Sequence, residues 1–269
     1  MDVNGVEICV ETFGAVTDPA VLLVHGASAS MLWWEDELCA RVAAAGRYVI
    51  RFDNRDTGRS VSYPPGHPGY TLRDLTDDAV GVLDALGIER AHLVGRSMAG
   101  AIVAQAAVCH SQRVASLTIV SSTPGGADLP GMSAEFLGYV GGPGPDPTDR
   151  SAVVDFIVGL MRVYSGSPHF DEAAMRELAV RDVDRTVDIA ACLTNHFVMD
   201  FGAPLDIGLV AVPTLVVHGD RDPVFPLPHG EALRAAIPGA DLLVLAGTGH
   251  ELPPPVWDVF VPRLIGHTG

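Results

Sequence analysis

Short apolar segments alternate with amphipathic ones along most of the chain. Segments 20–24 and 114–120 are almost wholly apolar, which is typical of strands buried on both faces of a parallel sheet. Segment 6–13 alternates apolar and polar residues, which favours a half-buried antiparallel edge strand. Amphipathic segments of helical length lie between the strands, so the pattern predicts an α/β fold with a mostly parallel, doubly wound sheet. The predicted strands are Val6–Phe13, Ala20–Val24, Tyr48–Phe52, Ala91–Val94, Val114–Val120, Thr214–Val217 and Asp241–Leu245, and the helices flanking them include Trp33–Ala45, Met98–His110, Pro228–Ile237 and Pro255–Ile265.

The alternation is interrupted between residues 124 and 206. Glycine and proline dominate 124–147, and helical patterns follow without a strand candidate. A segment of about eighty residues of this kind, between two strand-rich regions, is typical of an inserted helical cap. We therefore predict a core domain formed by 1–123 and 207–269, and a helical cap, or lid, formed by 124–206. The predicted cap helices are Val153–Val163, Glu172–Arg181 and Val187–Phe201.

A nucleophile elbow is predicted where the strand at 91–94 meets the helix at 98–110. Ser97 stands at the apex of this turn, with Gly95 two residues before it and Ala99 two residues after it. Small residues are needed there because the turn is strained and leaves little space around the serine. By itself the pentapeptide is also compatible with an ordinary turn in which Ser97 caps a helix.

An acid and a histidine follow later strands in the order that completes a Ser-Asp-His set. Asp222 lies in the loop after the strand at 214–217, and His250 lies in the loop after the last strand. Carboxyl ends of parallel strands share one sheet edge, so we expect Ser97, Asp222 and His250 to meet as nucleophile, acid and base. Asp220 is the competing acid, and we expect His218 to be structural. His25, at another strand end, is either a scaffold residue of its loop or a chance strand end.

Two backbone N–H groups are candidates for an oxyanion hole: that of Met98, directly after the serine, and that of Ala27, in the loop after the strand at 20–24. A substrate pocket is predicted beside them. Its aromatic members are open to a second interpretation, in which they pack the cap onto the core. The predicted pocket residues are Ser28, Trp33, Trp34, Phe136, Tyr139 and Phe197.

Composition and charge exclude several classes of function and partner. Hydrophobic residues make up 48% of the 269 residues, enough for a sizeable core, and the net charge of −16 disfavours nucleic acid and anionic membrane surfaces as partners. No apolar run reaches membrane-spanning length, and the first residues lack the pattern of a signal peptide, so we expect a cytoplasmic protein. The four cysteines are widely spaced, and we expect no disulfide, no metal site and no cofactor. We expect a monomer or a homodimer.

These motifs together resemble the serine α/β-hydrolases from end to end. The matching pieces are His25-Gly26, Asp53-x-Arg55-x-x-Gly58-x-Ser60, Gly95-x-Ser97-x-Ala99-Gly100, Gly219-x-x-Asp222-Pro223 and Gly249-His250. Within this family the chain is most similar to the aclacinomycin methylesterase group, on the segment 51–60, on Asp222-Pro223 with Pro228-His229-Gly230, and on Gly247-x-Gly249-His250-x-Leu252-Pro253. The resemblance implies an eight-stranded α/β-hydrolase sheet, with Ser97 as nucleophile, Asp222 as acid, His250 as base, and Ala27 and Met98 as oxyanion donors.

The chain departs from the methylesterase group at Ala99, where glycine is common, and at His25-Gly26-Ala27. The cap shows little similarity, so anthracycline specificity does not carry over. We expect a serine esterase acting on a small-molecule ester. A lactonase, a C–C bond hydrolase and a cofactor-free perhydrolase remain alternatives on the same three residues, and a non-catalytic small-molecule binding protein is the alternative from another class.

Overall fold

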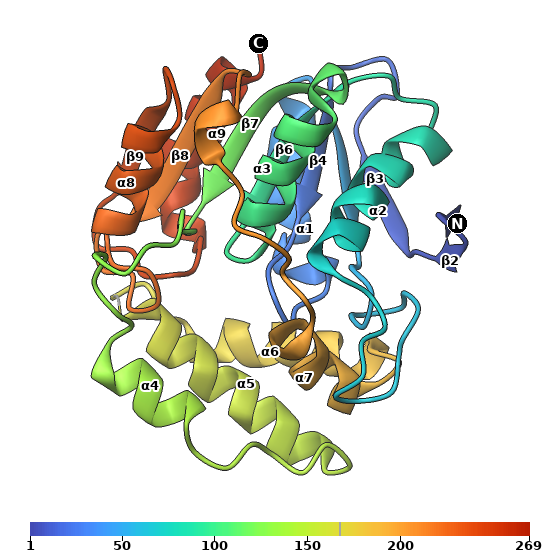
Figure 1. Cartoon of the computed structure of the whole chain (residues 1–269). Coiled ribbons are helices and arrows are strands. Elements are labelled where there is room, and N and C mark those ends of the chain that lie inside the picture. The colour runs from blue at the N-terminus through green and yellow to red at the C-terminus, as the bar shows by residue number, and fades with distance from the viewer. Residues whose placement is uncertain (167) are drawn as a thin grey trace.

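The computed structural model describes residues 1–166 and 168–269. Its main sheet consists of β3 (Val10–Phe13), β4 (Ala20–Val24), β5 (Tyr48–Phe52), β6 (Ala91–Arg96), β7 (Val114–Val120), β8 (Thr214–Gly219) and β9 (Asp241–Leu245). The strand order is β3-β5-β4-β6-β7-β8-β9 (Figure 1), with β3 antiparallel to β5 and every other neighbouring pair parallel. The predicted α/β class with a mostly parallel sheet is confirmed.

The main sheet has seven strands in the described part of the chain, one fewer than the eight expected from the family resemblance. The N-terminal segment forms a separate hairpin of β1 (Asp2–Val3) and β2 (Val6–Glu7). The predicted strand at 6–13 is interrupted because the N–H of Ile8 donates to Met1 and that of Cys9 donates to the Ser60 hydroxyl. The N–H groups of residues 8 and 9 are thus used outside the hydrogen bonding between β3 and β5, and only β3 joins the main sheet.

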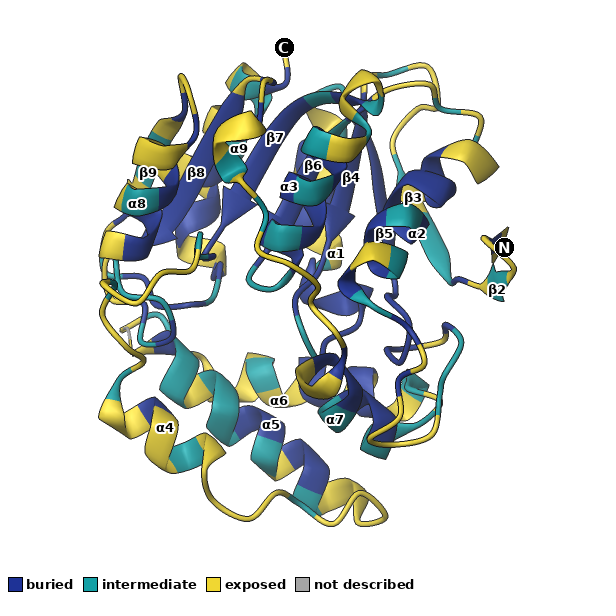
Figure 2. Ribbon diagram, viewed as in Figure 1, coloured by how far each residue is buried: buried dark blue, intermediate teal, exposed yellow. Residues whose placement is uncertain are grey.

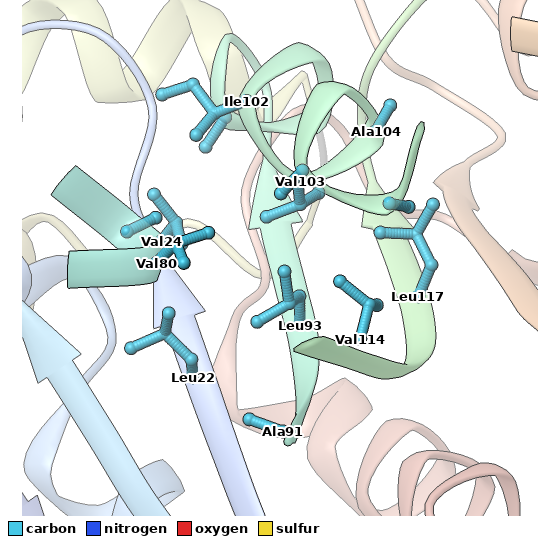
Figure 3. Close-up of a cluster of buried hydrophobic side chains, with 14 of the residues drawn as sticks. Leu22, Val24, Val80, Ala91, Leu93, Ile102, Val103, Ala104, Val114 and Leu117 are labelled. Atoms are coloured by element: carbon cyan, nitrogen blue, oxygen red, sulfur yellow. The ribbon is translucent and has the colours of Figure 1, made fainter. Parts of the chain in front are cut away.

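Helices cover both faces of the sheet. One face carries α1 (Asp36–Ala44) and α9 (Trp257–His267), and the other carries α2 (Leu72–Ala85), α3 (Ala99–Cys109) and α8 (Pro228–Ala236). Alternate residues of each central strand enter the two layers, so these strands are buried almost throughout (Figure 2). Val103 of α3 lies over Leu93 of β6, in one buried cluster that also holds Ile102 (Figure 3). This packing holds β6 and α3, and therefore the turn between them, in a rigid layer.

The first long helix begins later than predicted, at Asp36 rather than at Trp33. A 3₁₀ turn, η1 (Met31–Trp33), precedes it. The carbonyl of Trp34 accepts hydrogen bonds from Arg51 and from the Cys39 thiol, and the indole N–H of Trp33 donates to Asp182. These side-chain contacts hold residues 33 and 34 outside the helical ladder.

A helical insertion separates β7 from β8 and lies across the end of the sheet where the parallel strands finish (Figure 1). Its helices are α4 (Ala134–Val140), α5 (Arg150–Ser165), α6 (Glu172–Arg185) and α7 (Ile189–Val198). The insertion is consistent with a cap; the exact division at residues 123/124 and 206/207 stays a prediction. The pattern missed α4 because the helix is short and lies in a glycine-rich and proline-rich stretch. Of the described helices, none is long and apolar enough to cross a membrane.

Two neighbouring carboxylates on α2 provide a matched test of what burial contributes to stability. Asp78 forms a bidentate ion pair with Arg55, and their side chains are 1% and 9% exposed. Asp77 pairs with Arg73 on the surface, where the side chains are 40% and 51% exposed. Asp78→Ala should lower the free energy of unfolding by about 3–5 kcal/mol, because it leaves a buried guanidinium unpaired. Asp77→Ala should change it by less than about 1 kcal/mol. Urea unfolding midpoints at unchanged m values measure both effects, and equal shifts for the two variants would contradict the assignment.

Candidate active site

The turn that carries Ser97 has the backbone strain expected of a nucleophile elbow. Ser97 has φ +55°, in the left-handed region that a residue with a side chain rarely adopts. A Cβ atom built at Gly95 would lie 2.3 Å from the carbonyl oxygen of Ala99, so only glycine fits there. A Cβ atom at Gly26 would lie 2.9 Å from the Cβ of Ser97. The loop after β4 therefore approaches the serine as closely as the backbone allows.

Hydrogen bonds to the last residue of β7 and to Ser122 beyond it hold the strained turn in place. The N–H of Ser97 donates to the carbonyl of Val120 at 2.9 Å, and the hydroxyl of Ser122 donates to the carbonyl of Ser97 at 2.8 Å. Both polar groups of the Ser97 backbone are thus satisfied outside any helix or strand ladder. Sequence reasoning did not single out Ser122, because a serine after a strand carries no specific signal.

The structure brings together the three side chains that were predicted to meet. Ser97 Oγ lies 2.9 Å from Nε2 of His250, and Nδ1 of His250 lies 2.8 Å from Oδ2 of Asp222. An ionised Asp222 only accepts hydrogen bonds, so Nδ1 carries the ring proton and Nε2 is the acceptor for the Ser97 hydroxyl. The competing acid, Asp220, is exposed and accepts the N–H of Gly247 at 2.7 Å instead. Asp222 is therefore the acid that faces His250.

Asp222 is held in its ionised form. Burial raises the pKa of Asp222, but the adjacent His250 lowers it by charge and by hydrogen bonding, so that the pKa lies below the ordinary value. Oδ1 also accepts the N–H groups of Val224 and Phe225, at 2.8 and 2.9 Å. The carboxylate thus keeps its negative charge while its two oxygens have fixed partners.

The two other strand-end histidines lie buried in the scaffold. Nε2 of His218 lies 2.6 Å from the carbonyl oxygen of Phe225, which fits the structural role predicted for it. His25 is buried beside Trp33 and Trp34, with ring centroids 6.5 and 6.1 Å away. Burial holds the pKa of His25 well below its ordinary value, so its ring is neutral at pH 7. Its backbone carbonyl accepts the side-chain N–H of Asn54 at 2.9 Å, which braces the loop after β4.

The two predicted oxyanion donors lie on either side of the elbow. Met98 precedes the first residue of α3, and Ala27 follows Gly26, whose Cα approaches the Ser97 side chain. Within residues 1–166 and 168–269, neither N–H group donates a hydrogen bond to the protein. Both amides therefore keep their hydrogen-bonding capacity, and that of Met98 also lies at the positive end of the α3 dipole.

Aromatic rings from the insertion and from the β8–α8 loop enclose His250. Tyr164 of α5 stacks on the imidazole with centroids 5.0 Å apart, and Phe225 meets it edge-on at 5.7 Å. The carbonyl of Tyr164 also accepts the backbone N–H of His250 at 2.9 Å. Phe136 of α4 stacks on Tyr164 in turn, at 5.3 Å. The insertion therefore fixes the orientation of the imidazole, a role that no spacing in the sequence could reveal.

The predicted pocket residues do not form one surface. Trp34 is buried in the core layer with α1 and α9, and Tyr139 is occupied with Phe156, whose carbonyl accepts its hydroxyl. Phe197 is 64% exposed. Ser28 lies in the loop after β4 with φ +55°. Trp34 thus lies in the core and Phe197 on the surface of α7, and a pocket formed by these residues stays a prediction.

A cavity of about 720 Å³ lies between the start of α6 and the loop after His250, and Trp33 is the one predicted pocket residue among its described lining. Arg96, directly before Ser97, reaches this cavity and donates to the carbonyl of His250 at 2.9 Å. Burial lowers the pKa of Arg96. In the described part of the chain, no group of three or more His, Cys, Asp and Glu side chains is arranged to hold a metal ion.

This fold, with a strained serine at the end of β6 and the imidazole and carboxylate beside it, defines a class of proteins. The model of the alpha/beta hydrolase family matches residues 21–263, and the chain belongs to this family. Over 283 residues it is 30% identical to rhodomycin D methylesterase DauP of Streptomyces sp. (strain C5), with 96% of this chain and 93% of that protein covered. The resemblance to the methylesterase group is thereby confirmed.

Other members of the family are also similar. The chain is 30% identical over 244 residues to the 2-hydroxy-6-oxononadienedioate/2-hydroxy-6-oxononatrienedioate hydrolase of Paraburkholderia xenovorans (strain LB400), covering 86% of this chain and 80% of that protein. The crystal structure of the esterase RhEst1 from Rhodococcus sp. ECU1013 superposes with a TM-score of 0.80 at 22% identity, covering 100% of this chain and 98% of that one. The latter likeness establishes the shared fold.

The steric account of the elbow predicts a specific intolerance at Gly95. Gly95→Ala should lower the free energy of unfolding by about 3 kcal/mol, since the new methyl group meets backbone atoms of α3 that cannot move aside. Gly138→Ala is the control, because a Cβ atom at Gly138 in α4 meets nothing within 4 Å. It should be neutral or stabilise by up to about 1 kcal/mol. Thermal and urea unfolding measure both, and a wild-type stability for Gly95→Ala would show that the elbow is not built as described.

Proposed function

We propose that this protein is a serine-dependent carboxylic ester hydrolase that works through an acyl-enzyme. The observation that carries the proposal is the hydrogen-bonded chain from Ser97 through His250 to Asp222. Serine alone is a poor nucleophile and needs a base to take its proton and an acid to orient that base. All three requirements have a candidate within hydrogen-bonding distance at one edge of the sheet.

In the first half-reaction, Ser97 Oγ attacks the ester carbonyl carbon while Nε2 of His250 takes the hydroxyl proton. Asp222 keeps the imidazole in the correct tautomer and stabilises the imidazolium that forms. The N–H groups of Ala27 and Met98 donate to the negatively charged oxygen of the tetrahedral intermediate. When the intermediate collapses, the C–O bond to the alcohol breaks and His250 returns the proton to the departing oxygen.

In the second half-reaction, water attacks the acyl-enzyme and His250 takes a proton from it. The same two N–H groups stabilise the second tetrahedral intermediate. The bond to Ser97 Oγ then breaks, His250 returns the proton to the serine, and the carboxylic acid leaves. No cofactor enters any step of the proposal.

We propose a small apolar ester as the substrate, with a methyl ester of a polyketide-like compound as the first to test. Support comes from the similarity to rhodomycin D methylesterase over nearly the whole chain. The aromatic rings of Phe136, Tyr164 and Phe225 around the imidazole add apolar surface beside the reacting serine. C–C bond hydrolysis is the second candidate, because of the similarity to the 2-hydroxy-6-oxononadienedioate hydrolase. Turnover of a panel of esters, lactones and 2-hydroxy-6-oxo dienoic acids would separate these activities.

Removal of the proposed nucleophile is the direct test. Ser97→Ala should lower kcat for a p-nitrophenyl ester by roughly 10⁴-fold or more, because no other group can form the acyl-enzyme. A fluorophosphonate probe should label the wild type on Ser97 and leave the variant unlabelled. Ser151→Ala, on the exposed start of α5, is the control and should keep full activity. A wild type that takes no label would favour a protein that only binds small molecules.

The two neighbouring acids after β8 test the role of Asp222. Asp222→Asn should lower kcat by about 10⁴-fold, since the amide can present N–H to the imidazole and favour the wrong tautomer. Asp220→Asn should keep kcat within about twofold of the wild type. Its side-chain oxygen can still accept the N–H of Gly247, and Asp220 takes no part in the proposed reaction. Steady-state kinetics on one ester compare them. Equal losses in the two variants would remove Asp222 from its proposed position.

A further inference from the structure

The segment that joins β4 to α1, residues 25–35, is held by the helical insertion as well as by the core. We call it the β4–α1 segment. We propose that His196 of α7 is a positioning residue that sets this segment, and with it the N–H of Ala27, for stabilisation of the oxyanion. The inference rests on the proposed function, in which Ala27 supplies one of the two oxyanion donors.

His196 bridges the β4–α1 segment and the loop after β5. Its Nδ1 lies 3.2 Å from the backbone nitrogen of Ser28, and its Nε2 lies 2.9 Å from the carbonyl oxygen of Arg55. A backbone N–H can only donate and a carbonyl can only accept, so the ring must accept at Nδ1 and carry its proton on Nε2. His196 is 1% exposed. The contact with Arg55 is therefore buried and the contact with Ser28 part-buried, and loss of the ring would leave two backbone groups with little access to replacement partners.

The position of Ser28 makes this bond relevant to chemistry. Ser28 directly follows Ala27 and has φ +55°, a conformation that needs support from its surroundings. Without an acceptor, the part-buried N–H of Ser28 would lose its only protein partner among the described residues, and the peptide units on either side would turn to find another. The N–H of Ala27 is one residue away, so it would move from its place beside Ser97.

Two further contacts show that the insertion holds the whole β4–α1 segment. Asp182 of α6 accepts hydrogen bonds from the hydroxyl of Ser30 and from the indole of Trp33. The side chains of Ala29, Leu32 and Trp33 share one apolar cluster with residues of α5 and α6. The β4–α1 segment and the insertion are therefore packed against each other, and the contact from His196 to Ser28 is one of the bonds that fix the segment's backbone.

The ring must be neutral to play this role. Burial is the main reason that the pKa of His196 falls to about 4, so the ring accepts at Nδ1 throughout the neutral range. The charged groups near it are Asp56, which accepts from Tyr70 and Asn195, and Arg55, which is paired with Asp78. The ring of Tyr70 faces the imidazole edge-on at 6.2 Å.

Three variants separate a positioning role from a merely structural one. Glutamine can replace both contacts, because its side-chain oxygen accepts and its NH₂ donates at about the spacing of the two ring nitrogens. His196→Gln should therefore keep kcat within about threefold. His196→Leu removes both contacts and should lower kcat for a p-nitrophenyl ester by about 10- to 100-fold with KM within about twofold, a loss below that of deleting an oxyanion donor outright. His196→Met fills a similar volume without a strong donor or acceptor and should behave like His196→Leu, which covers the case that the leucine variant fails to fold.

The neighbouring residue supplies the matched control. Asn195 is equally buried and anchors α7 to residues 56–66, but it does not touch the β4–α1 segment. Asn195→Leu should lower stability and leave the kcat of the folded enzyme within about threefold. If Asn195→Leu lowers kcat as much as His196→Leu, or if His196→Gln fails to rescue it, the positioning role is wrong. Unchanged kcat in both His196→Leu and His196→Met would overturn it as well.

A measurement that does not use turnover keeps this inference apart from the proposed function. The amide proton of Ser28 should move upfield in the NMR spectra of His196→Leu and His196→Met, because it loses its acceptor, and should stay near its wild-type position in His196→Gln. Fluorophosphonate labelling of the wild type tests Ser97 independently. A labelled wild type with an unmoved Ser28 amide in the leucine and methionine variants would refute the inference alone, whereas an unlabelled wild type would refute the proposed function.

Discussion

The left-handed backbone at Ser97 is the constraint on which the rest of the site depends. A serine at φ +55° is held only because β6 and α3 are locked by packing on either side of it. The close approaches at Gly95 and Gly26 follow from this turn, because no side chain fits against it. The hydroxyl group is thereby exposed at the sheet edge, where His250 reaches it at 2.9 Å.

Burial then decides the state of each group around the serine. Asp222 keeps its charge in a buried place because His250 and two backbone N–H groups compensate for lost water. His25 and His196 have no such charged partner within the site, and burial lowers the pKa of each so that both rings are neutral at pH 7. All three side chains are buried, but their charge states differ because their partners differ: Asp222 is ionised, whereas His25 and His196 are neutral.

The insertion contributes to the site through fixed contacts. Tyr164 stacks on His250, Arg185 of α6 forms a buried ion pair with Asp53, and Asp182 binds the β4–α1 segment. Breaking a buried pair of this kind is costly, since it leaves a charge without water or partner. Helices α5 and α6 of the insertion are thus joined to the core close to Ser97 and its neighbours.

The periodic pattern of the chain by itself determined the α/β class, the interruption by helices, and the order of Ser97, Asp222 and His250, because strand burial and strand-end placement follow from local composition. Its seven predicted strands correspond to those of the main sheet, but it could not place the break in the first of them, since the break at Cys9 involves a bond to a distant serine. It also missed α4 and the contacts that His196 makes with Ser28 and Arg55. Those features depend on which surfaces meet across the insertion, and only the tertiary structure decides what a side chain on a helix faces.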